Sequence, residues 1–344
     1  GLLIMNIIKS YITSLLFFGI LLMWGSNAFA DNAGGRGSFL HGGWAGARYI
    51  ASGMTGEVMA DDVFAIYWNP AGLSELLTKK NLTEEQITDK AKEGNVSDIS
   101  EEDLLNFSEA GARKMFFSIG ISAARLDVER DALFSGVAFN AFSGVLGVGL
   151  YSIMSNDIET RDNNGALTGH TGYSGSAAYL SYSMSGDIFS FGVTVKGIHE
   201  RIGDSMYAGA GADLGIQVYM LPFLKAGFII RDAGSFLRPY DADNSETRYD
   251  FIKPQIRGGV LFMSDSGVRF SLCGSKKLEQ DNFEYGAGIE YTLSRYLVIN
   301  GGLDNSFFTA GLTVKAGAFN CSYALCFDRI DSGYNNTVSL GMFF

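Results

Sequence analysis

The sequence predicts an all-β fold, a transmembrane antiparallel β-barrel of about fourteen strands with an N-terminal plug, or hatch, that contains short helices. Three observations predict it. Short segments that alternate apolar and polar residues follow one another from residue 114 to the end. The connections between these segments are short and long in turn. The last segment is apolar on one face and ends in an aromatic residue, Phe344.

The N-terminus has the order of segments that is typical of a secretory signal. Lys9 precedes an apolar run from Tyr11 to Trp24, and Ser26-Asn27-Ala28-Phe29-Ala30 then supplies the small residues of a cleavage site. We therefore expect residues 1–30 to be a cleaved signal peptide of a protein exported to the outer membrane. The alternative, a retained helical anchor, is disfavoured because a spanning helix needs roughly 20 apolar residues.

The composition excludes some classes of function. The formal net charge of -11 gives the protein no electrostatic attraction for a phosphate backbone, so a nucleic-acid partner is not expected. The chain has 44 Gly, 26 Phe and 16 Tyr but only 4 Pro, which suits a barrel whose strands alternate small and aromatic residues. Cys321 and Cys326 would lie on opposite faces of one strand, so they are not expected to form a disulfide.

The segment from Met206 to Met220 shows the alternation most clearly. One face is apolar and consists of Ala208, Ala210, Ala212, Leu214, Ile216 and Val218. The other face consists of Gly209, Gly211, Asp213, Gly215 and Gln217. The first face suits lipid and the second suits a lumen. Repetition of the pattern, for example in 188–199 and 306–316, favours a barrel over the half-buried sheet of a soluble sandwich.

Segments of this kind predict the positions of the strands and of their connections. The expected strands are 115–125, 132–141, 145–154, 175–184, 188–199, 206–219, 223–232, 255–263, 267–276, 283–292, 296–303, 306–316, 318–328 and 335–344. The connections after even-numbered strands are short, whereas 155–174 and 233–254, after odd-numbered strands, are long. A barrel with both termini in the periplasm sorts its connections in this way.

The final predicted strand is expected to close the barrel. Its lipid-facing residues would be Asn336, Val338, Leu340, Met342 and Phe344. Pairing with the first strand, whose Phe117, Ile119 and Ile121 would also face lipid, removes an exposed apolar edge. An apolar last strand with an aromatic end is also the pattern expected for recognition by the barrel-assembly machinery, which would then be a partner during biogenesis.

Residues 31–113 differ in character and are expected to form the plug, ahead of a barrel at 114–344. They contain the spaced string Gly46-Ala47-Arg48, Gly53, Ala60-Asp61-Asp62 and Asn69-Pro70-Ala71-Gly72-Leu73. This string resembles the N-terminal signature of the PorV/PorQ family of outer-membrane proteins, within the wider FadL-like group of barrels related to the long-chain fatty-acid transporter. The resemblance continues at 191–196 and 212–215, and it implies a barrel of about fourteen strands with a hatch in its lumen.

The residues of the plug motif suggest a physical role of their own. In Asn69-Pro70-Ala71-Gly72, the proline forces Asn69 to be extended and Gly72 permits a tight or left-handed exit, so we expect a kinked element within the lumen. An ordinary turn at a helix end is the alternative. Arg48, Asp61 and Asp62 are expected either to tether the plug to charged residues of the lumen or to be solvated.

An acidic insert at 77–113 departs from the pattern of the family. Thr83-Glu84-Glu85-Gln86 and Ser100-Glu101-Glu102-Asp103 have the spacing of two helix starts with capping boxes. We expect a solvated pair of helices here, while docking of a partner, lining of the periplasmic mouth and a mobile segment remain alternatives.

No catalytic or metal-binding motif is evident. His41, His170 and His199 are scattered, and no HExxH, P-loop or CxxC sequence occurs, so neither an enzyme nor a cofactor or metal is expected. The strand register instead places a set of charges inward, which we expect to form a mixed-sign network between wall and plug. These charges are Lys196, Asp213, Lys225, Arg231, Arg257, Arg269, Glu284, Glu290, Lys315 and Asp328.

Two functions agree with these features. The resemblance to FadL-like proteins implies uptake of a hydrophobic or amphipathic small molecule through the plugged lumen. An apolar track for it would be formed by the inward aromatic residues Phe116, Phe134, Tyr151, Tyr179 and Tyr219. The resemblance to PorV implies an accessory or shuttle protein of a secretion or surface-attachment system, which large ordered outer loops would favour. The expected partners are outer-membrane lipid and either a hydrophobic ligand or a secretion-system protein.

Overall fold

The computed structural model describes residues 39–77, 116–126, 130–162, 164–240, 249–278, 283–327 and 333–344. The expected signal peptide at 1–30 and all but the first residue of the acidic insert at 77–113 lie outside these ranges. Both therefore remain predictions, as does the inward position of Asp328.

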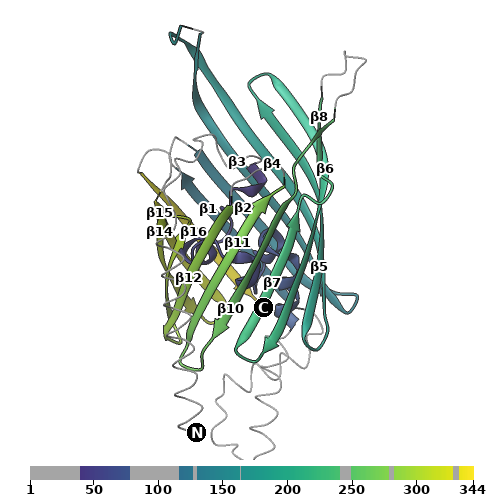
Figure 1. Cartoon of the computed structure of the whole chain (residues 1–344), viewed down its shortest axis with the longest axis vertical. Coiled ribbons are helices and arrows are strands. Elements are labelled where there is room, and N and C mark those ends of the chain that lie inside the picture. Colours follow the sequence, from purple (N-terminus) through teal and green to yellow (C-terminus); the bar gives the residue numbers. More distant parts are fainter. Residues whose placement is uncertain are drawn as a thin grey trace, which may run out of the picture. The chain divides into compact units, whose positions relative to one another are not determined.

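The wall is a closed antiparallel barrel, as the sequence predicts (Figure 1). Each strand pairs with its neighbour in sequence, β7 pairs with β10, and β1 pairs with β16 to close the ring. The fourteen wall strands are β1 (Phe117–Leu126), β2 (Arg130–Ala141), β3 (Gly144–Arg161), β4 (Leu167–Ser185), β5 (Phe189–Ile202), β6 (Ser205–Leu221), β7 (Leu224–Arg231), β10 (Gln255–Met263), β11 (Val268–Lys277), β12 (Phe283–Ser294), β13 (Leu297–Asp304), β14 (Phe307–Ala316), β15 (Phe319–Phe327) and β16 (Tyr334–Phe343).

Two of the expected long loops contain regular structure, so their prediction as loops is wrong. The connection 233–254 contains β8 (Phe236–Pro239), which pairs with β6, and β9 (Asp250–Phe251), which pairs with β8. The expected loop 155–174 is the end of a long hairpin, because β3 continues to Arg161 and β4 begins at Leu167. Backbone pairing needs no apolar face, so strands that extend beyond the lipid lose the alternation by which they were sought.

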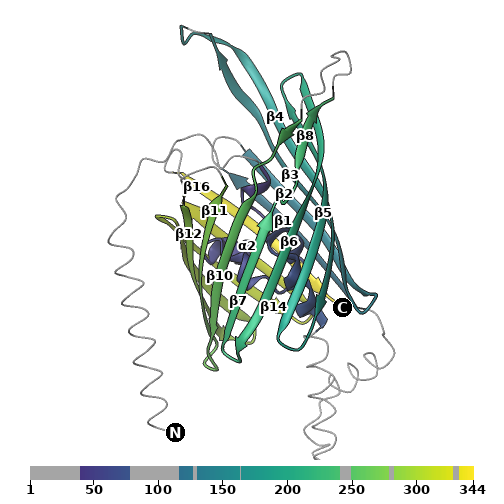
Figure 2. The ribbon, with the colours of Figure 1, turned by 45° about the vertical axis from the view of Figure 1, so that its right-hand side comes forward.

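This β3–β4 hairpin extends past its neighbours (Figure 2). The pairing of β3 with β2 ends at Ser155, and that of β4 with β5 ends at Tyr173. Beyond these residues the two strands pair with one another alone. The hairpin is therefore an ordered projection at the end of the barrel that carries the long connections.

The predicted inner and outer faces of the wall are confirmed on β5, β6 and β14. On β6, Leu214 and Ile216 are exposed to the outside, while Asp213 and Gln217 are buried. On β5, Phe191 is exposed and Thr194 is fully buried. The outer face is thus the apolar band that a membrane-spanning barrel presents to lipid. Within the described ranges, none of the helices is long and apolar enough to cross a membrane.

The predicted closing strand is also confirmed. The amide of Phe117 donates to the carbonyl of Phe344 at 3.1 Å, and the amide of Phe344 donates to the carbonyl of Phe117 at 2.8 Å. Ile121 lies opposite Leu340 in the same register, so the outer faces of the first and last strands are continuous. The barrel leaves no apolar edge at this seam.

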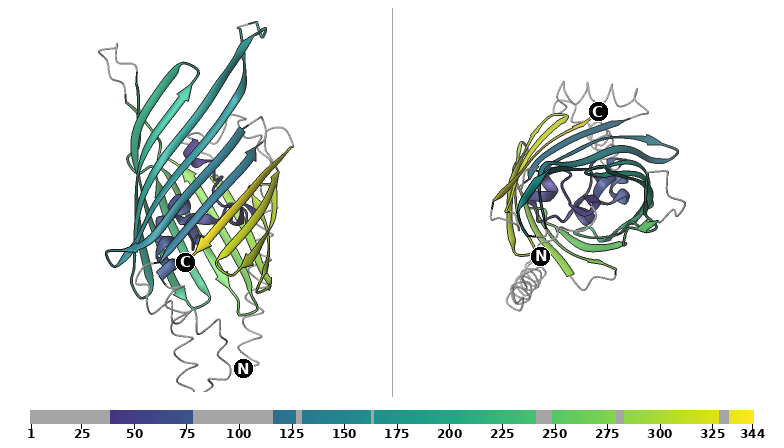
Figure 3. Two further views of the ribbon diagram at one scale, coloured as in Figure 1. Left: turned by 180° about the vertical axis from the view of Figure 1, so that it is seen from behind. Right: turned by 90° about the horizontal axis from the view of Figure 1, so that it is seen from above.

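The N-terminal residues 39–77 lie inside the ring of strands (Figure 3). They form five short helices, η1 (Phe39–His41), α2 (Ala47–Ala51), α3 (Gly56–Met59), α4 (Ala65–Trp68) and η2 (Pro70–Ser74). Almost every residue of these helices is buried. Because none of the helices exceeds five residues, their order comes from packing against the wall and not from helix propensity.

We expect Leu214→Arg to destabilise the folded barrel by about 2–4 kcal/mol, because Leu214 lies midway along the lipid-facing side of β6 and a charge there enters hydrocarbon. Leu293→Arg is the control. Leu293 is also exposed, but it lies at the end of β12, where the cost falls to about 0–1 kcal/mol. Equilibrium unfolding in lipid vesicles measures both, and equal losses would contradict the depth that we assign to Leu214.

Candidate functional site

The lumen is filled by the plug, residues 39–77, which contacts the wall all the way round. Helix α2 packs against β13 to β16, α3 packs against β7, β10 and β11, and η2 packs against β3 to β6. Large side chains of the plug, among them Tyr49, Ile66 and Trp68, are essentially inaccessible to solvent. The interior is therefore a packed core in this state.

The plug motif lies against the inner face of the wall. Asn69 is extended, with φ of -159°, as expected for a residue before proline. Its Oδ1 accepts from the amide of Ala71 at 3.1 Å, and its Nδ2 donates to the carbonyl of Glu57 at 2.7 Å. Ser183 of β4 donates to the carbonyl of Ala71 at 3.1 Å. The motif thus joins two parts of the plug to each other and to β4.

Of the tight or left-handed exit expected at Gly72, the structure has the tight form, because the amide of Gly72 donates to the carbonyl of Asn69 at 2.9 Å and its φ is not positive. A close approach explains the glycine instead. A Cβ at this position would lie 2.2 Å from the carbonyl oxygen of Ala60. Gly72 is small so that two turns of the plug can touch.

Glycines on the inner face of the wall make room for the motif. A Cβ at Gly192 would lie 2.3 Å from backbone atoms of Pro70 and Ala71, and one at Gly215 would lie 2.0 Å from Oδ1 of Asn69. The alternating inner glycines of β5 and β6 therefore place plug backbone directly against strand backbone. Any side chain at Gly215 would displace Asn69.

We expect Gly192→Ala to loosen the plug and to cost about 1–3 kcal/mol in folding free energy, because the added methyl group overlaps the backbone at Pro70. Gly197→Ala is a matched control on the same strand, since nothing lies within 4 Å of the Cβ position there. Denaturant unfolding in vesicles measures the difference, and a Gly192→Ala protein as stable as the control would contradict this packing.

Four charged side chains join α2 to the wall. Arg48 pairs with Asp61 at 2.7 Å within the plug and with Glu290 of β12 at 2.6 Å. Arg269 of β11 pairs with Asp61 and Glu290, each at 3.3 Å. Arg48 and Asp61 therefore tether the plug and are not simply solvated. Asp62 is not one of these four, and its carboxylate accepts a hydrogen bond from the amide of Phe64 at 2.9 Å.

Two further ion pairs fix α3 and the end of the plug. Arg257 of β10 pairs with Glu57 at 3.2 Å and donates to the carbonyl of Met54 at 2.8 Å. Lys225 of β7 lies 3.6 Å from Glu75, to which Tyr219 also donates at 2.7 Å. Each pair joins a wall strand to the plug.

A third cluster surrounds Asp232, which follows β7. Lys196 lies 2.7 Å from Asp213 and 2.8 Å from Asp232, and His41 of the plug lies 2.7 Å from Asp232. Burial acts to raise the pKa of Asp232, but Lys196 and His41 together outweigh it, so the pKa lies well below its usual value. Burial lowers the pKa of His41, so a neutral ring donates its Nε2 proton to the carboxylate.

The remaining predicted lumen charges lie outside these clusters. Glu284 accepts a hydrogen bond from Ser275 at 3.1 Å. Lys315 has the inward register and is exposed at the end of β14. Glu57, Glu75, His41 and Asp232 were missed as network members, because no strand alternation orients residues of the plug and its surroundings.

Three of the five predicted inward aromatic residues, Phe134, Tyr151 and Tyr179, form a cluster with rings of the plug. The other two lie apart from it, Phe116 against Phe343 and Tyr219 beside Lys225. Tyr67 lies 5.0 Å from Tyr151, 6.4 Å from Phe134 and 6.3 Å from Tyr179, measured between ring centroids. Phe39 stacks on Tyr151 at 6.3 Å. The rings fill the lumen by contacting one another, so the aromatic residues do not line an open track in this state.

Arg231 gives this aromatic cluster a polar side. Its guanidinium carbon lies 4.9 Å from the ring centre of Tyr67 and 5.3 Å from that of Trp68. Nη2 donates to the carbonyls of both residues. Nε and Nη1 are buried and have no hydrogen-bond partner among the described residues. An acceptor group brought beside the rings would find two donors there.

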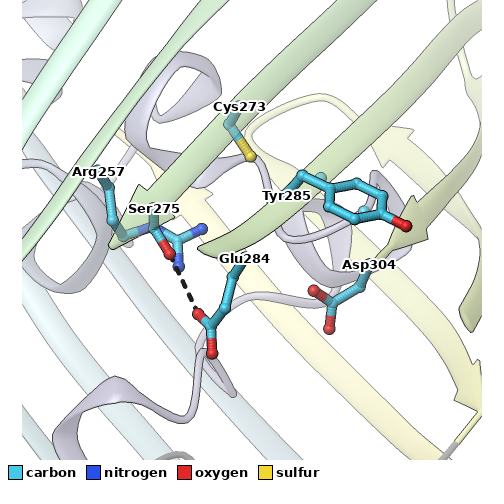
Figure 4. A pocket seen from close by; sticks show the side chains of 8 residues that line it. Arg257, Cys273, Ser275, Glu284, Tyr285 and Asp304 are labelled. Atoms are coloured by element: carbon cyan, nitrogen blue, oxygen red, sulfur yellow. Dashed lines mark hydrogen bonds between the residues drawn. The ribbon is translucent and has the colours of Figure 1, made fainter. Parts of the chain in front are cut away.

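A small pocket lies between Gly53 of the plug and strands β10 to β13 (Figure 4). It is lined by Arg257, Cys273, Ser275, Glu284, Tyr285 and Asp304, among others, and its cavity volume is about 10 Å³. This is about the space of one water molecule. In the described part of the chain, no group of three or more His, Cys, Asp or Glu residues is placed to hold a metal ion.

Known structures share this fold. No family model matches the chain, and no curated protein matches it in sequence. The toluene transporter TbuX of Ralstonia pickettii aligns with a TM-score of 0.53 and 12% identity over 87% of this chain and 97% of its own.

Two other structures are also similar. The toluene transporter TodX of Pseudomonas putida aligns with a TM-score of 0.52 and 11% identity over 87% of this chain and 96% of its own. A FadL homologue of Pseudomonas aeruginosa aligns less well, with a TM-score of 0.49 and 8% identity over 87% and 98% of the two chains. At these identities the likeness concerns the fold, and the fold of this chain is that of the toluene transporters TbuX and TodX.

Proposed function

We propose that the protein lies in the outer membrane and takes up hydrophobic or amphipathic small molecules through its lumen, which residues 46–73 of the plug occlude in the described state. The apolar outer face of the wall supports the membrane location. The fold shared with two toluene transporters supports uptake of apolar molecules.

The aromatic cluster beside Arg231 is the observation that carries this proposal. Tyr67, Phe134, Tyr151 and Tyr179 supply apolar contact area, and the two buried donors of Arg231 supply a polar anchor. This combination suits an amphipathic molecule with an apolar body and a carboxylate or other acceptor. Since the rings now contact one another, entry of such a molecule requires the plug to shift.

Uptake by whole cells tests the proposal. Cells that lack their own channel of this fold would express the chain, and the entry of labelled toluene, palmitate and glucose would be compared with that of cells carrying an empty vector. We expect faster entry of toluene and palmitate but not of glucose. Entry equal to that of the empty-vector cells for both apolar compounds would contradict transport.

Two variants refine the test. Arg231→Met should reduce the entry of palmitate and spare that of toluene, because only the carboxylate needs the two donors. Arg295→Met, at an exposed turn outside the lumen, is the control. Equal loss of both substrates in Arg231→Met would show a structural role for Arg231 and would remove the carboxylate from the proposal.

A PorV-like accessory role in protein secretion or surface attachment is the second candidate. The observation that favours it is the ordered β3–β4 hairpin, which extends past its neighbours as a large outer element. Shortening this hairpin by removing 157–171 would then impair the export or attachment of secreted proteins and leave the uptake of small molecules intact. The opposite result would favour transport.

A further inference from the structure

Three basic side chains gather on the outer face of the wall, away from the lumen. His199 and Arg201 lie on β5 and Arg238 lies on β8, and all three are exposed. We call them the outer basic patch. His199 lies opposite Ala208 of β6, which lies opposite Arg238. Directly paired residues share a face, so His199 and Arg238 flank a single small residue.

The next row of the sheet extends the patch. Arg201 lies opposite Met206, and the carbonyl of Met206 accepts from the amide of Tyr240 at 2.8 Å. Tyr240 is 71% exposed. The strands β5, β6 and β8 thus bring the patch together from distant parts of the sequence (Figure 1).

The patch lies at the boundary of the apolar band. On β5 the outward residues Phe189, Phe191, Val193 and Val195 come first, followed by Gly197 and then by His199. For a strand tilted by about 40°, the ten residue steps from Phe189 to His199 span about 25 Å along the barrel axis. That is the height of the apolar band of such a barrel, so the patch lies level with lipid headgroups. The patch lies at the end of the barrel that carries the long connections. Long connections are typical of the outer end, so these headgroups belong to the outer leaflet.

A strip of small residues runs below the patch on the same face. Gly197 lies opposite Ala178 on one side and Ala210 on the other, and nothing lies within 4 Å of a Cβ built at Gly197. Beyond Ala210, the same row continues to Phe236 and Phe251, of which Phe251 is 71% exposed. The strip is thus a row of small residues with an aromatic border on the outer face.

The charges of the patch are available for a ligand. The chain as a whole is acidic, with a net charge of -11, so this is a local concentration of positive charge. Among the described residues, no ion pair involves His199, Arg201 or Arg238, whereas Arg125 at the same end of the wall pairs with Asp131 at 3.3 Å. Nε of Arg201 donates to the carbonyl of Gly203 at 2.9 Å. The two terminal nitrogens of the guanidinium are left to contact a ligand. Glu200, between His199 and Arg201 on β5, points to the other face and accepts from Tyr173 at 2.7 Å, and Asp204 lies in the adjacent turn.

We propose that the outer basic patch binds a phosphorylated lipid of the outer leaflet, with the phosphate at His199, Arg201 and Arg238 and an acyl chain on the strip at Gly197 and Ala210. Arginines hold phosphate through paired charge-assisted hydrogen bonds. The apolar strip directly below them favours a lipid over a free anion, because only a lipid has an acyl chain that can contact the strip. This proposal is independent of the transport function.

Native mass spectrometry of the full chain in mild detergent tests the proposal, with diphosphoryl lipid A as the probe. We expect the lipid to bind, and Arg201→Gln with Arg238→Gln to raise its apparent Kd on the order of 30-fold. Arg125→Gln with Lys276→Gln removes two exposed basic residues from the same end of the wall and is the control, expected to leave the Kd within about twofold. Arg201→Lys with Arg238→Lys should retain most of the affinity.

Dephosphorylated lipid A and inorganic phosphate distinguish the possible ligands on the unaltered protein. We expect the dephosphorylated lipid to bind weakly and inorganic phosphate at the same concentration to displace nothing. Equal binding of both lipids, displacement by inorganic phosphate, or an equal loss in the control pair would overturn the proposal. A lipid-free dimer that the glutamine pair abolishes would overturn it as well, since the patch would then be an interface between copies of the chain.

Discussion

Deletion of residues 46–73 should turn a closed barrel into an open pore. The deletion removes α2, α3, α4 and most of η2, which fill the lumen by direct packing against the wall. A barrel of about fourteen strands encloses more space than its own side chains can fill. The wall charges that the plug now neutralises, such as Glu290 and Arg257, would then be hydrated by the water of the pore. The expected result is stable conductance in planar bilayers from the deleted protein and a closed state for the intact one.

The wall has to survive the deletion for this result to be informative. We expect it to survive, because the seam between β1 and β16 and all the ladder pairs are formed without the plug. Heat-modifiable migration on gels would show assembly of both proteins, and Gly197→Ala would serve as a closed control. If the deleted protein assembles and remains as closed as the intact one, residues 46–73 are not the seal, and the uptake route through the lumen loses its main support.

The wall was predictable because lipid imposes a simple rule on it. A residue such as Leu214 must face hydrocarbon and its neighbour Asp213 must not. Apolar and polar residues therefore alternate along β6. The rule ends where the lipid ends. The outer parts of β3 and β4, and the short strands β8 and β9, follow no such rule, and the sequence therefore indicated loops there.

The interior was predictable in kind but not in detail. The register identified Lys196, Arg257 and Glu290 as inward charges, yet their partners Asp232, Glu57 and Arg48 come from segments that no periodic pattern orients. Inner glycines were visible on β5 and β6 as well. Which of these glycines touch the plug depends on how the N-terminal residues fold back into the lumen. That contact cannot be predicted from the alternation of residues along a strand.

The ion pair of Arg257 and Glu57 should have the largest effect on stability among the plug contacts. Both side chains are nearly inaccessible, at 5% and 0% exposure, and Arg257 also holds the carbonyl of Met54 at 2.8 Å. Its guanidinium lies 5.7 Å from the ring centre of Trp68. Removing the arginine leaves the Glu57 carboxylate buried without its counterion, so Arg257→Met should lower the free energy of unfolding by about 3–5 kcal/mol.

A double variant separates the ion pair from simple loss of packing. In Arg257→Met with Glu57→Leu no charge is left buried, so most of the lost stability should return. Arg295→Met, at an exposed turn, should change the free energy of unfolding by less than about 0.5 kcal/mol. Denaturant unfolding of the unaltered protein and of these three variants in the same vesicles gives the comparison. If the double variant is as unstable as Arg257→Met, the loss comes from the contacts of Arg257 with Met54 and Trp68, and Glu57 is not the partner that makes this arginine necessary.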